Sequence, residues 1–180
     1  MMKAKLETAR LLLRPWSEDD AAALYEYARD PRVGPAAGWP VHTSVENSRE
    51  IIKTVLCKDG TYAVTVKPEA DPVGSAGIFA TTAPGISGEY EIGYWIGVPF
   101  WGRGFIPEAV NALLDMAFSD MAQERVWCSH FDGNNKSRRV IEKCGFVYQL
   151  TAPAPERYGT DRPELYYSIT KEEYEKWRAI

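Results

Sequence analysis

The alternation of hydrophobic and polar positions along the chain predicts strands and helices in a mixed order. Runs rich in β-branched and aromatic residues, bounded by proline or glycine, are typical of strands. They fall at residues 11–16, 62–66, 73–80, 89–97, 125–131, 146–151 and 165–169. Apolar residues three or four positions apart predict helices at 17–29, 43–60, 107–121, 134–144 and 171–180. This order predicts an α+β (mixed α/β) fold.

Turn and capping residues add a topology to this order. Residues 17–20 read Ser-Glu-Asp-Asp, a capping box with acidic residues in the first helical turn. The strands 62–66, 73–80 and 89–97 follow one another across short Pro/Gly turns and predict an antiparallel meander. Residues 31–40 are rich in proline and glycine. We expect no regular element there, although the segment is too apolar for a plain solvated loop.

Length and composition fit one compact domain spanning residues 1–180. The chain has 180 residues, 45% hydrophobic and 26% charged, an ordinary globular balance. A net charge of −4 and a pI near 5.3 give no reason to expect nucleic acid or a membrane as a partner. Three cysteines without a C-x-x-C pair predict a reduced, cytoplasmic protein. Cys128 and Cys144 lie in apolar contexts and are expected in the core.

Several common catalytic centres are absent from the sequence. The chain has two histidines, His42 and His130, and no His/Cys cluster with ligand spacing, so we expect no metal. Neither a G-x-x-x-x-G-K-[ST] phosphate loop nor a G-x-S-x-G nucleophile elbow occurs. Gly102 and Gly104 lack the third glycine of a dinucleotide fingerprint, because Pro107 stands in its place.

Two segments remain that could hold an anionic ligand. In the loop Trp101-Gly102-Arg103-Gly104-Phe105, glycines let a ligand approach the backbone, and the helix start that follows attracts anions. The helix 134–144 carries four cations and one anion between Lys136 and Lys143. The alternative explanation for the loop is that its glycines only form a tight strand-to-helix turn. The alternative for the helix is that its charges only form a solvated face. A parallel pairing of strands 89–97 and 125–131 would bring the two segments together around an extended, phosphorylated thiol cofactor.

In this order, the segments resemble the GNAT superfamily of N-acetyltransferases. Residues 101–105 with Pro107-Glu108-Ala109 look like its acetyl-CoA signature. The next family motif resembles Asn134-x-x-Ser137-x-Arg139-Val140-Ile141-Glu142-Lys143-x-Gly145-Phe146. The ribosomal-protein alanine N-acetyltransferases are similar at Glu91-Ile92-Gly93-Tyr94-Trp95-Ile96 and Glu7-Thr8-Ala9-Arg10-Leu11-x-Leu13-Arg14. The resemblance covers almost the whole chain.

The resemblance implies a mixed, mostly antiparallel sheet flanked by helices and splayed between its fourth and fifth strands. Acetyl-CoA would lie in the splay as co-substrate. The backbone of Ile96 to Val98 would pair with the pantetheine as an added strand, and N–H groups from Gly102 to Ile106 would hold the pyrophosphate. The expected cofactor contacts are Ile96, Gly97, Val98, Gly102, Arg103, Gly104, Phe105, Ile106, Asn134, Ser137, Arg139 and Lys143. A homodimer is common among such relatives.

Three positions depart from the family pattern. Pro99 replaces a usual Gln or Arg, and Ile106 replaces a frequent, smaller Ala. Ile141 stands where many relatives carry a tyrosine general acid. The absence of that tyrosine keeps a non-catalytic acyl-CoA-binding module as an alternative to an enzyme.

Direct acetyl transfer needs a neutral amine and a group that protonates the leaving thiolate. We expect Glu91 to orient a water or take the amine's proton. Glu89 is the fallback because strand register is open, and pairing of the carboxylate with a cross-strand cation is the structural alternative. Ser137 is expected to hydrogen-bond the departing sulfur, or else only to occupy the first turn of its helix. Glu108 is expected to cap its own helix rather than to bind substrate.

The expected acceptor is a protein N-terminal α-amine, as in the ribosomal-protein enzymes that the chain resembles. Its pKa of about 7.7–8.0 demands less base assistance than a lysine near 10.4. Amino acids, polyamines and antibiotic amines are the alternative. The apolar segment 31–40 is expected to fold over the acceptor side. Aromatic residues crowd that side or pack in the core: Trp39, Tyr90, Tyr94, Trp95, Tyr158, Tyr166 and Tyr167.

Overall fold

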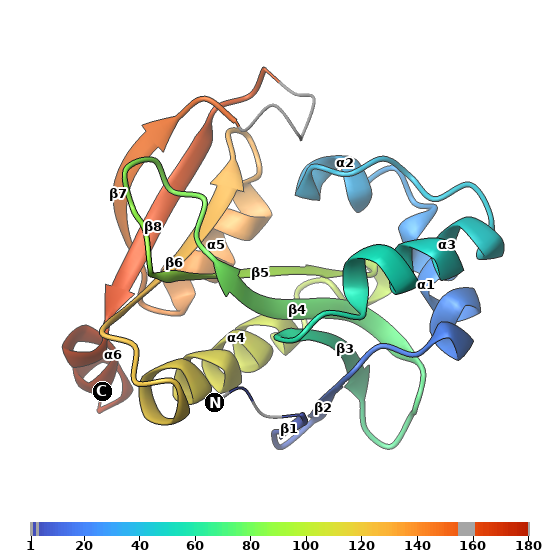
Figure 1. Ribbon diagram of the computed structural model, residues 1–180, viewed down its shortest axis with the longest axis horizontal. Coiled ribbons are helices and arrows are strands. Elements are labelled where there is room, and N and C mark those ends of the chain that lie inside the picture. The colour runs from blue at the N-terminus through green and yellow to red at the C-terminus, as the bar shows by residue number, and fades with distance from the viewer. Residues whose placement is uncertain (1, 3, 155–160, 180) are drawn as a thin grey trace.

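One continuous sheet organises the protein. The computed structural model describes residues 2, 4–154 and 161–179, so Tyr158 lies outside the described residues. Within these ranges eight strands form a sheet in the order β1-β2-β3-β4-β5-β6-β8-β7, with helices on both faces (Figure 1). All neighbouring strands are antiparallel except β5 and β6, which run parallel. The predicted mixed, mostly antiparallel sheet and the meander β3-β4-β5 are confirmed.

The elements follow the predicted order. The strands are β1 Leu6–Glu7, β2 Leu11–Arg14, β3 Thr61–Val66, β4 Pro72–Ala80, β5 Tyr90–Ile96, β6 Arg125–Phe131, β7 Val147–Ala152 and β8 Glu164–Thr170. The α-helices are α1 Ala21–Ala28, α2 Gly34–Ala37, α3 Val45–Ile51, α4 Phe105–Asp115, α5 Asn135–Lys143 and α6 Lys171–Arg178. Short 3-10 turns are η1 Glu18–Asp20 and η3 Val98–Phe100, and π-helical turns are η2 Ile52–Leu56 and η4 Met116–Asp120.

Two local features differ from the prediction. The strand β1 was not predicted, because two residues are too few to show an alternating pattern. The expectation of no regular element at 31–40 was wrong. The short helix α2 forms there with Pro35 in its first turn, and Gly38, at φ 87°, ends it in the left-handed conformation that glycine permits. Proline and glycine thus bound this helix instead of preventing it.

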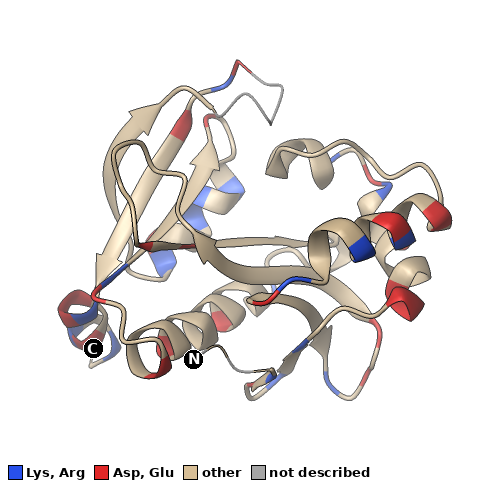
Figure 2. Cartoon of the chain, in the orientation of Figure 1, with Lys and Arg blue, Asp and Glu red and all other residues tan. Residues whose placement is uncertain are grey.

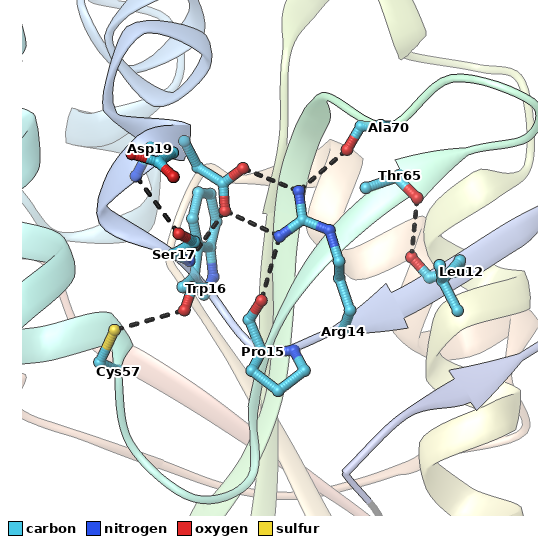
Figure 3. A network of polar contacts seen from close by, with 10 residues as sticks. Leu12, Arg14, Pro15, Trp16, Ser17, Asp19, Cys57, Thr65 and Ala70 are labelled. Carbon is cyan, nitrogen blue, oxygen red and sulfur yellow. Dashed lines mark hydrogen bonds and ion pairs between the residues drawn. The ribbon is translucent and has the colours of Figure 1, made fainter.

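The predicted capping box at Ser17 is present and joins a larger polar network (Figure 3). The carboxylate of Asp20 accepts the backbone N–H of Ser17 at 2.9 Å and two guanidinium N–H groups of Arg14 at 2.8 and 2.7 Å. Arg14 also donates to the carbonyl of Ala70 at 2.9 Å. This network ties β2, the first helix and the β3–β4 connection together.

Asp20→Ala is expected to lower the free energy of unfolding by about 2–4 kcal/mol. Asp20 is buried, and its loss leaves the Arg14 guanidinium without its carboxylate partner. Urea unfolding followed by circular dichroism measures the change. Asp19→Ala removes the same atoms from the exposed neighbouring residue and should cost less than about 1 kcal/mol. Equal losses in the two variants would contradict a stabilising role for the Arg14–Asp20 pair.

The two faces of β5 belong to different cores. Ile92 and Ile96 face the main core, which α4 covers, whereas Trp95 packs on the other face at 6.4 Å from Trp16, in the smaller core that includes α1. Cys128 and Cys144 are buried in the main core, as predicted. Since side chains alternate along a strand, β5 can present different chemistry on each side.

The parallel pair opens into a splay. β5 and β6 pair only from Tyr90 to Ile92, opposite Val126 to Cys128. Beyond that point their ends diverge. This confirms the predicted splay between the fourth and fifth strands, which are β5 and β6 once β1 is counted. Among the described residues, none of the helices has the length and apolar character that crossing a bilayer requires.

Candidate active site

A cavity of about 1150 Å³ fills the splay between β5 and β6. Its walls come from the diverging ends of both strands, the loop before α4, the first turns of α5, and α2. Ligand pockets in proteins usually measure about 300–1,000 Å³. The cavity therefore has room for an extended ligand together with a second reactant.

The loop before α4 forms a backbone cradle on one wall. Gly102 and Gly104 have φ angles of 74° and 76°, a left-handed conformation that other residues rarely adopt. A Cβ atom at Gly102 would meet nothing within 4 Å, so the space beside it is open. Gly104 caps α4, whose first-turn N–H groups have no partner within the helix. Phe105 and Ile106 begin that turn and also line the cavity, so the cradle fits an anionic phosphate group.

Lysine and arginine residues along α5, which Figure 2 colours blue, make the facing wall of the cavity basic. Lys136, Arg139 and Lys143 line the cavity, and the ammonium of Lys136 lies 4.2 Å from the ring centroid of Trp101. Arg138 instead pairs with Glu142 at 2.8 Å. In a protein of net charge −4 this local excess of cations favours a polyanionic ligand.

Three predicted cofactor residues lie beside the cavity wall. The N–H of Gly97 donates to the carbonyl of Val73 at 2.8 Å, and the carbonyl of Val98 accepts the N–H of Trp101 at 3.1 Å. The guanidinium of Arg103 lies 4.9 Å from the ring centroid of Phe105. Contacts of these three residues with a cofactor stay predictions.

Ile96 and Asn134 do line the cavity, but protein groups also use their polar atoms. The carbonyl of Ile96 accepts the indole N–H of Trp101 at 3.0 Å. Asn134 caps α5 by accepting the N–H of Ser137 at 3.2 Å, and its amide donates to the carbonyl of Ala36 at 3.0 Å. Each oxygen has a second lone pair and the Asn134 amide a second N–H, so these bonds leave capacity for the predicted pairing at Ile96 and the predicted pantetheine contact of Asn134, which stay predictions.

The helix α2 covers the cavity on the side away from α4. Val33, Ala36 and Ala37 line the cavity from this segment. The Asn134 bond to Ala36 holds α2 to α5, and the guanidinium of Arg162 donates to the carbonyl of Pro35 at 2.8 Å. The segment 31–40 thus lies over the splay, and sequence separations of 98 and 127 residues show why no local pattern could predict these bonds.

The hydroxyl of Ser137 has a partner that the sequence did not reveal. Its Oγ lies 2.9 Å from the hydroxyl of Tyr94, which also reaches the Ser137 carbonyl at 3.2 Å. Burial raises the pKa of Tyr94 well above its ordinary value, so this hydroxyl keeps its proton. Ile141 is buried in the main core. Tyr94, from β5, therefore supplies a phenol in the cavity wall, where the sequence had shown only the missing tyrosine at Ile141 of α5.

Glu91 presents a buried carboxylate to the same cavity. It is 3% exposed, and its Oε2 accepts the hydroxyl of Thr81 at 3.0 Å and the N–H of Thr82 at 3.2 Å. Its Oε1 lies 2.5 Å from the hydroxyl of Ser129. Burial raises its pKa, which is a common property of catalytic carboxylates. Among the described residues its hydrogen-bond partners are hydroxyls and one backbone N–H, not the cross-strand cation considered as the alternative.

Glu89 and Glu108 lie in other surroundings. The carboxylate of Glu89 accepts the indole N–H of Trp127, away from the cavity wall. Glu108 does not cap its own helix as expected. Its carboxylate accepts the hydroxyl of Thr8 at 2.6 Å and the backbone N–H of Arg10 at 2.9 Å, because the N-terminal segment packs beside α4.

Glu164 and Ser129 complete the polar end of the cavity and were not predicted. Both line the cavity, and their oxygens lie 2.6 Å apart. They meet because β6 and β8 pair with Ser129 opposite Tyr166, which puts Glu164 on the same face two residues along β8. In the part of the chain that the structure describes, no group of three His, Cys, Asp or Glu residues could hold a metal ion.

Comparison with known proteins shows what the chain is similar to. Residues 10–147 match the acetyltransferase (GNAT) domain family. "Uncharacterized N-acetyltransferase p20" of Bacillus licheniformis is 28% identical over 94% of this chain and 97% of its own length. "Putative ribosomal N-acetyltransferase YdaF" of Bacillus subtilis is 38% identical over 47% of each chain. "Aminoglycoside N(6')-acetyltransferase type 1" of Klebsiella pneumoniae is 23% identical over 93% of this chain and 87% of its own.

The fold has a close counterpart among solved structures. The crystal structure of an acetyltransferase (GNAT family) from Bacillus anthracis superposes with a TM-score of 0.81. It covers 93% of this chain and 99% of its own, at 24% sequence identity. At that identity the likeness concerns the fold.

Proposed function

Since this chain belongs to the GNAT family and is an acetyl-CoA-dependent N-acetyltransferase, we propose that it transfers the acetyl group directly to a protein N-terminal α-amine. One observation carries the proposal. A single cavity joins an anion-binding cradle to a buried carboxylate, Glu91, and to a hydroxyl pair, Ser137 and Tyr94. A base for the amine and a proton donor for the thiolate would therefore line the same cavity.

The cradle and the basic helix fit acetyl-CoA, which would supply an acetyl thioester to the site. The N–H groups from Gly102 to Ile106 would hold the pyrophosphate, since the first turn of α4 leaves its N–H groups free. Arg139 and Lys143 would add positive charge on the facing wall. The pantetheine would then run along β5 toward Ser137.

On the acceptor face of β5, Glu91 would take the proton that the attacking amine must lose. An α-amine with a pKa of about 7.7–8.0 is already partly neutral near pH 7, so a carboxylate with a raised pKa suffices as base. On the other face, the Ser137 hydroxyl would donate to the departing sulfur. The Tyr94 hydroxyl, bonded to Ser137, would orient this donor and replace its proton.

The acceptor wall supports a peptide. Val33, Ala36, Phe79 and Trp95 make it largely apolar, and Phe79 is 41% exposed. An exposed aromatic ring beside a cavity offers a stacking and burial surface to the first residues of a chain. "Putative ribosomal N-acetyltransferase YdaF" of Bacillus subtilis is 38% identical over 47% of this chain. This similarity favours an acceptor of the same class.

A panel of amines tests the proposed acceptor. Peptides with free N-termini, the same peptides N-acetylated but carrying an internal lysine, amino acids, spermidine and an aminoglycoside are compared by thiol release and mass analysis. We expect the free N-terminal peptides to give at least about tenfold higher kcat/KM, a transition-state difference of about 1.4 kcal/mol. Faster turnover of a small amine would overturn the acceptor, whereas failure to bind acetyl-CoA in isothermal titration would overturn the donor.

A further inference from the structure

Two buried glutamates meet at one serine hydroxyl. The Oγ of Ser129 lies 2.5 Å from Glu91 Oε1 and 2.6 Å from Glu164 Oε1. Glu91 is 3% exposed and Glu164 4%. The two carboxyl groups come from β5 and β8, on either side of β6, and both line the acceptor end of the cavity.

The number of protons in this group follows from its geometry. A serine hydroxyl has one proton and can donate it to one acceptor. Both oxygen–oxygen distances are in the range of short O–H···O⁻ hydrogen bonds, about 2.5–2.7 Å. Two ionised carboxylates would leave one of these short contacts without a proton between its oxygens. This geometry fits one protonated carboxyl group that donates to Ser129, while Ser129 donates to the other.

We propose that Glu91 and Glu164 form a proton-sharing pair, bridged by Ser129, that carries a single negative charge in the resting site. Glu164 is then a positioning residue that acts on Glu91 through the bridge. The pair titrates in two steps that belong to both groups together, because like charges at this separation resist simultaneous ionisation.

The groups that face the pair support a total charge of −1. From β8, the hydroxyl of Tyr166 donates to Glu164 Oε2 at 2.7 Å. From the β4–β5 connection, Thr81 and Thr82 donate to Glu91 Oε2. The buried thiol of Cys128, whose pKa burial raises well above its ordinary value, lies on the opposite face of β6, in the main core. Within the described residues neither glutamate forms a salt bridge, and Arg32 and Arg162 are cations that line the same cavity.

This inference rests on the proposed function for its chemical consequence. The single carboxylate of the pair accepts the proton of the acceptor ammonium: one N–H bond breaks, one O–H bond forms, and the pair becomes neutral. The amine keeps its lone pair for attack. The protonated partner keeps the cavity from holding two negative charges.

Carboxyl titration tests the pair without substrate or turnover. The full-length protein is labelled with ¹³C at its glutamate side-chain carboxyls, and Glu91→Gln and Glu164→Gln assign the two signals. In the wild type, both signals should respond to both steps, with the upper step well above the ordinary glutamate pKa of about 4.3. Each single variant should show one step, at a lower pH than the upper step of the wild type. Glu89→Gln, at the glutamate bonded to Trp127, is the matched control and should leave both steps in place.

Two results would overturn the proton-sharing pair. One is ionisation of both wild-type glutamates in a single step near the ordinary value. The other is an upper step that stays at the same pH in Glu164→Gln, which would assign it to burial of Glu91 alone. Because Gln can donate to Ser129 as a protonated carboxyl does, Glu164→Gln should also move the upper inflection in the pH profile of kcat/KM to lower pH; a merely structural role would leave that inflection unchanged. Failure of the amine panel would leave the titration result standing, so the two hypotheses fail separately.

Discussion

Glu91→Gln is expected to lower kcat by about 10²–10⁴-fold while leaving the affinity for acetyl-CoA unchanged. The glutamine keeps the shape of the side chain, and its oxygen can still accept from Thr81 and Thr82, but it cannot take a proton from the amine. The proposed acetyl-CoA cradle lies elsewhere in the cavity, at Gly102 to Ile106. Steady-state kinetics at saturating amine measure the loss of turnover, and isothermal titration measures the affinity.

The pH dependence gives this prediction a second readout. Only the ionised carboxylate accepts a proton, and burial raises the pKa of Glu91. Wild-type turnover should therefore rise with pH through that raised pKa and fall as the pH drops below it. This acid limb should disappear in Glu91→Gln. Glu89→Gln removes the same charge two residues earlier, from a carboxylate bonded to Trp127, and should keep both the rate and the limb. Unchanged turnover in Glu91→Gln would remove Glu91 from the mechanism.

Ser137→Ala is expected to reduce kcat by about 10²-fold, because the leaving thiolate would lose its nearest proton donor. Tyr94→Phe removes the hydroxyl 2.9 Å behind Ser137 and should reduce kcat in the same direction, with the ring packing retained. If the two hydroxyls act as one unit, the double variant should be hardly slower than Ser137→Ala.

A matched tyrosine separates chemistry from general packing effects in this series. Tyr148 on β7 is 50% exposed, and its hydroxyl bonds to Thr151 outside the cavity wall. Tyr148→Phe should leave kcat unchanged. Losses in Ser137→Ala and Tyr94→Phe that multiply fully in the double variant would show two independent roles, and no loss in Ser137→Ala would reassign Ser137 to helix structure.

The Tyr94–Ser137 contact also removes the reason for a non-catalytic reading of the chain. That reading depended on Ile141, at the position of a general-acid tyrosine in many relatives. In the fold, Ile141 is 1% exposed and packs in the main core, whereas Tyr94 offers its hydroxyl from β5. A hydroxyl can thus reach the cavity from β5 instead of from α5. The acetyltransferase family match agrees with an active enzyme.

The sequence by itself determined the local secondary-structure elements and the acetyl donor. The strand β6 begins and ends at Arg125 and Phe131, as its pattern predicts, and Asn134 caps the predicted helix α5. These features are visible because side-chain alternation and helix capping are set by neighbours within a few positions. The loop glycines and the basic helix likewise carry their anion-binding chemistry in consecutive residues. Their order along the chain was enough to identify the family.

The tertiary structure alone decided how the reactive groups are paired. Glu91 meets Ser129 across 38 positions of sequence, Ser129 meets Glu164 across 35, and Tyr94 meets Ser137 across 43. Such pairs depend on strand register and on the point where β5 and β6 separate, which packing of the whole sheet fixes. A shift of one residue would turn Glu91 to the other face of β5. For this reason the sequence could predict Glu91 as the base and Ser137 as the proton donor. Only the folded sheet shows that Tyr94, Ser129 and Glu164 are their partners.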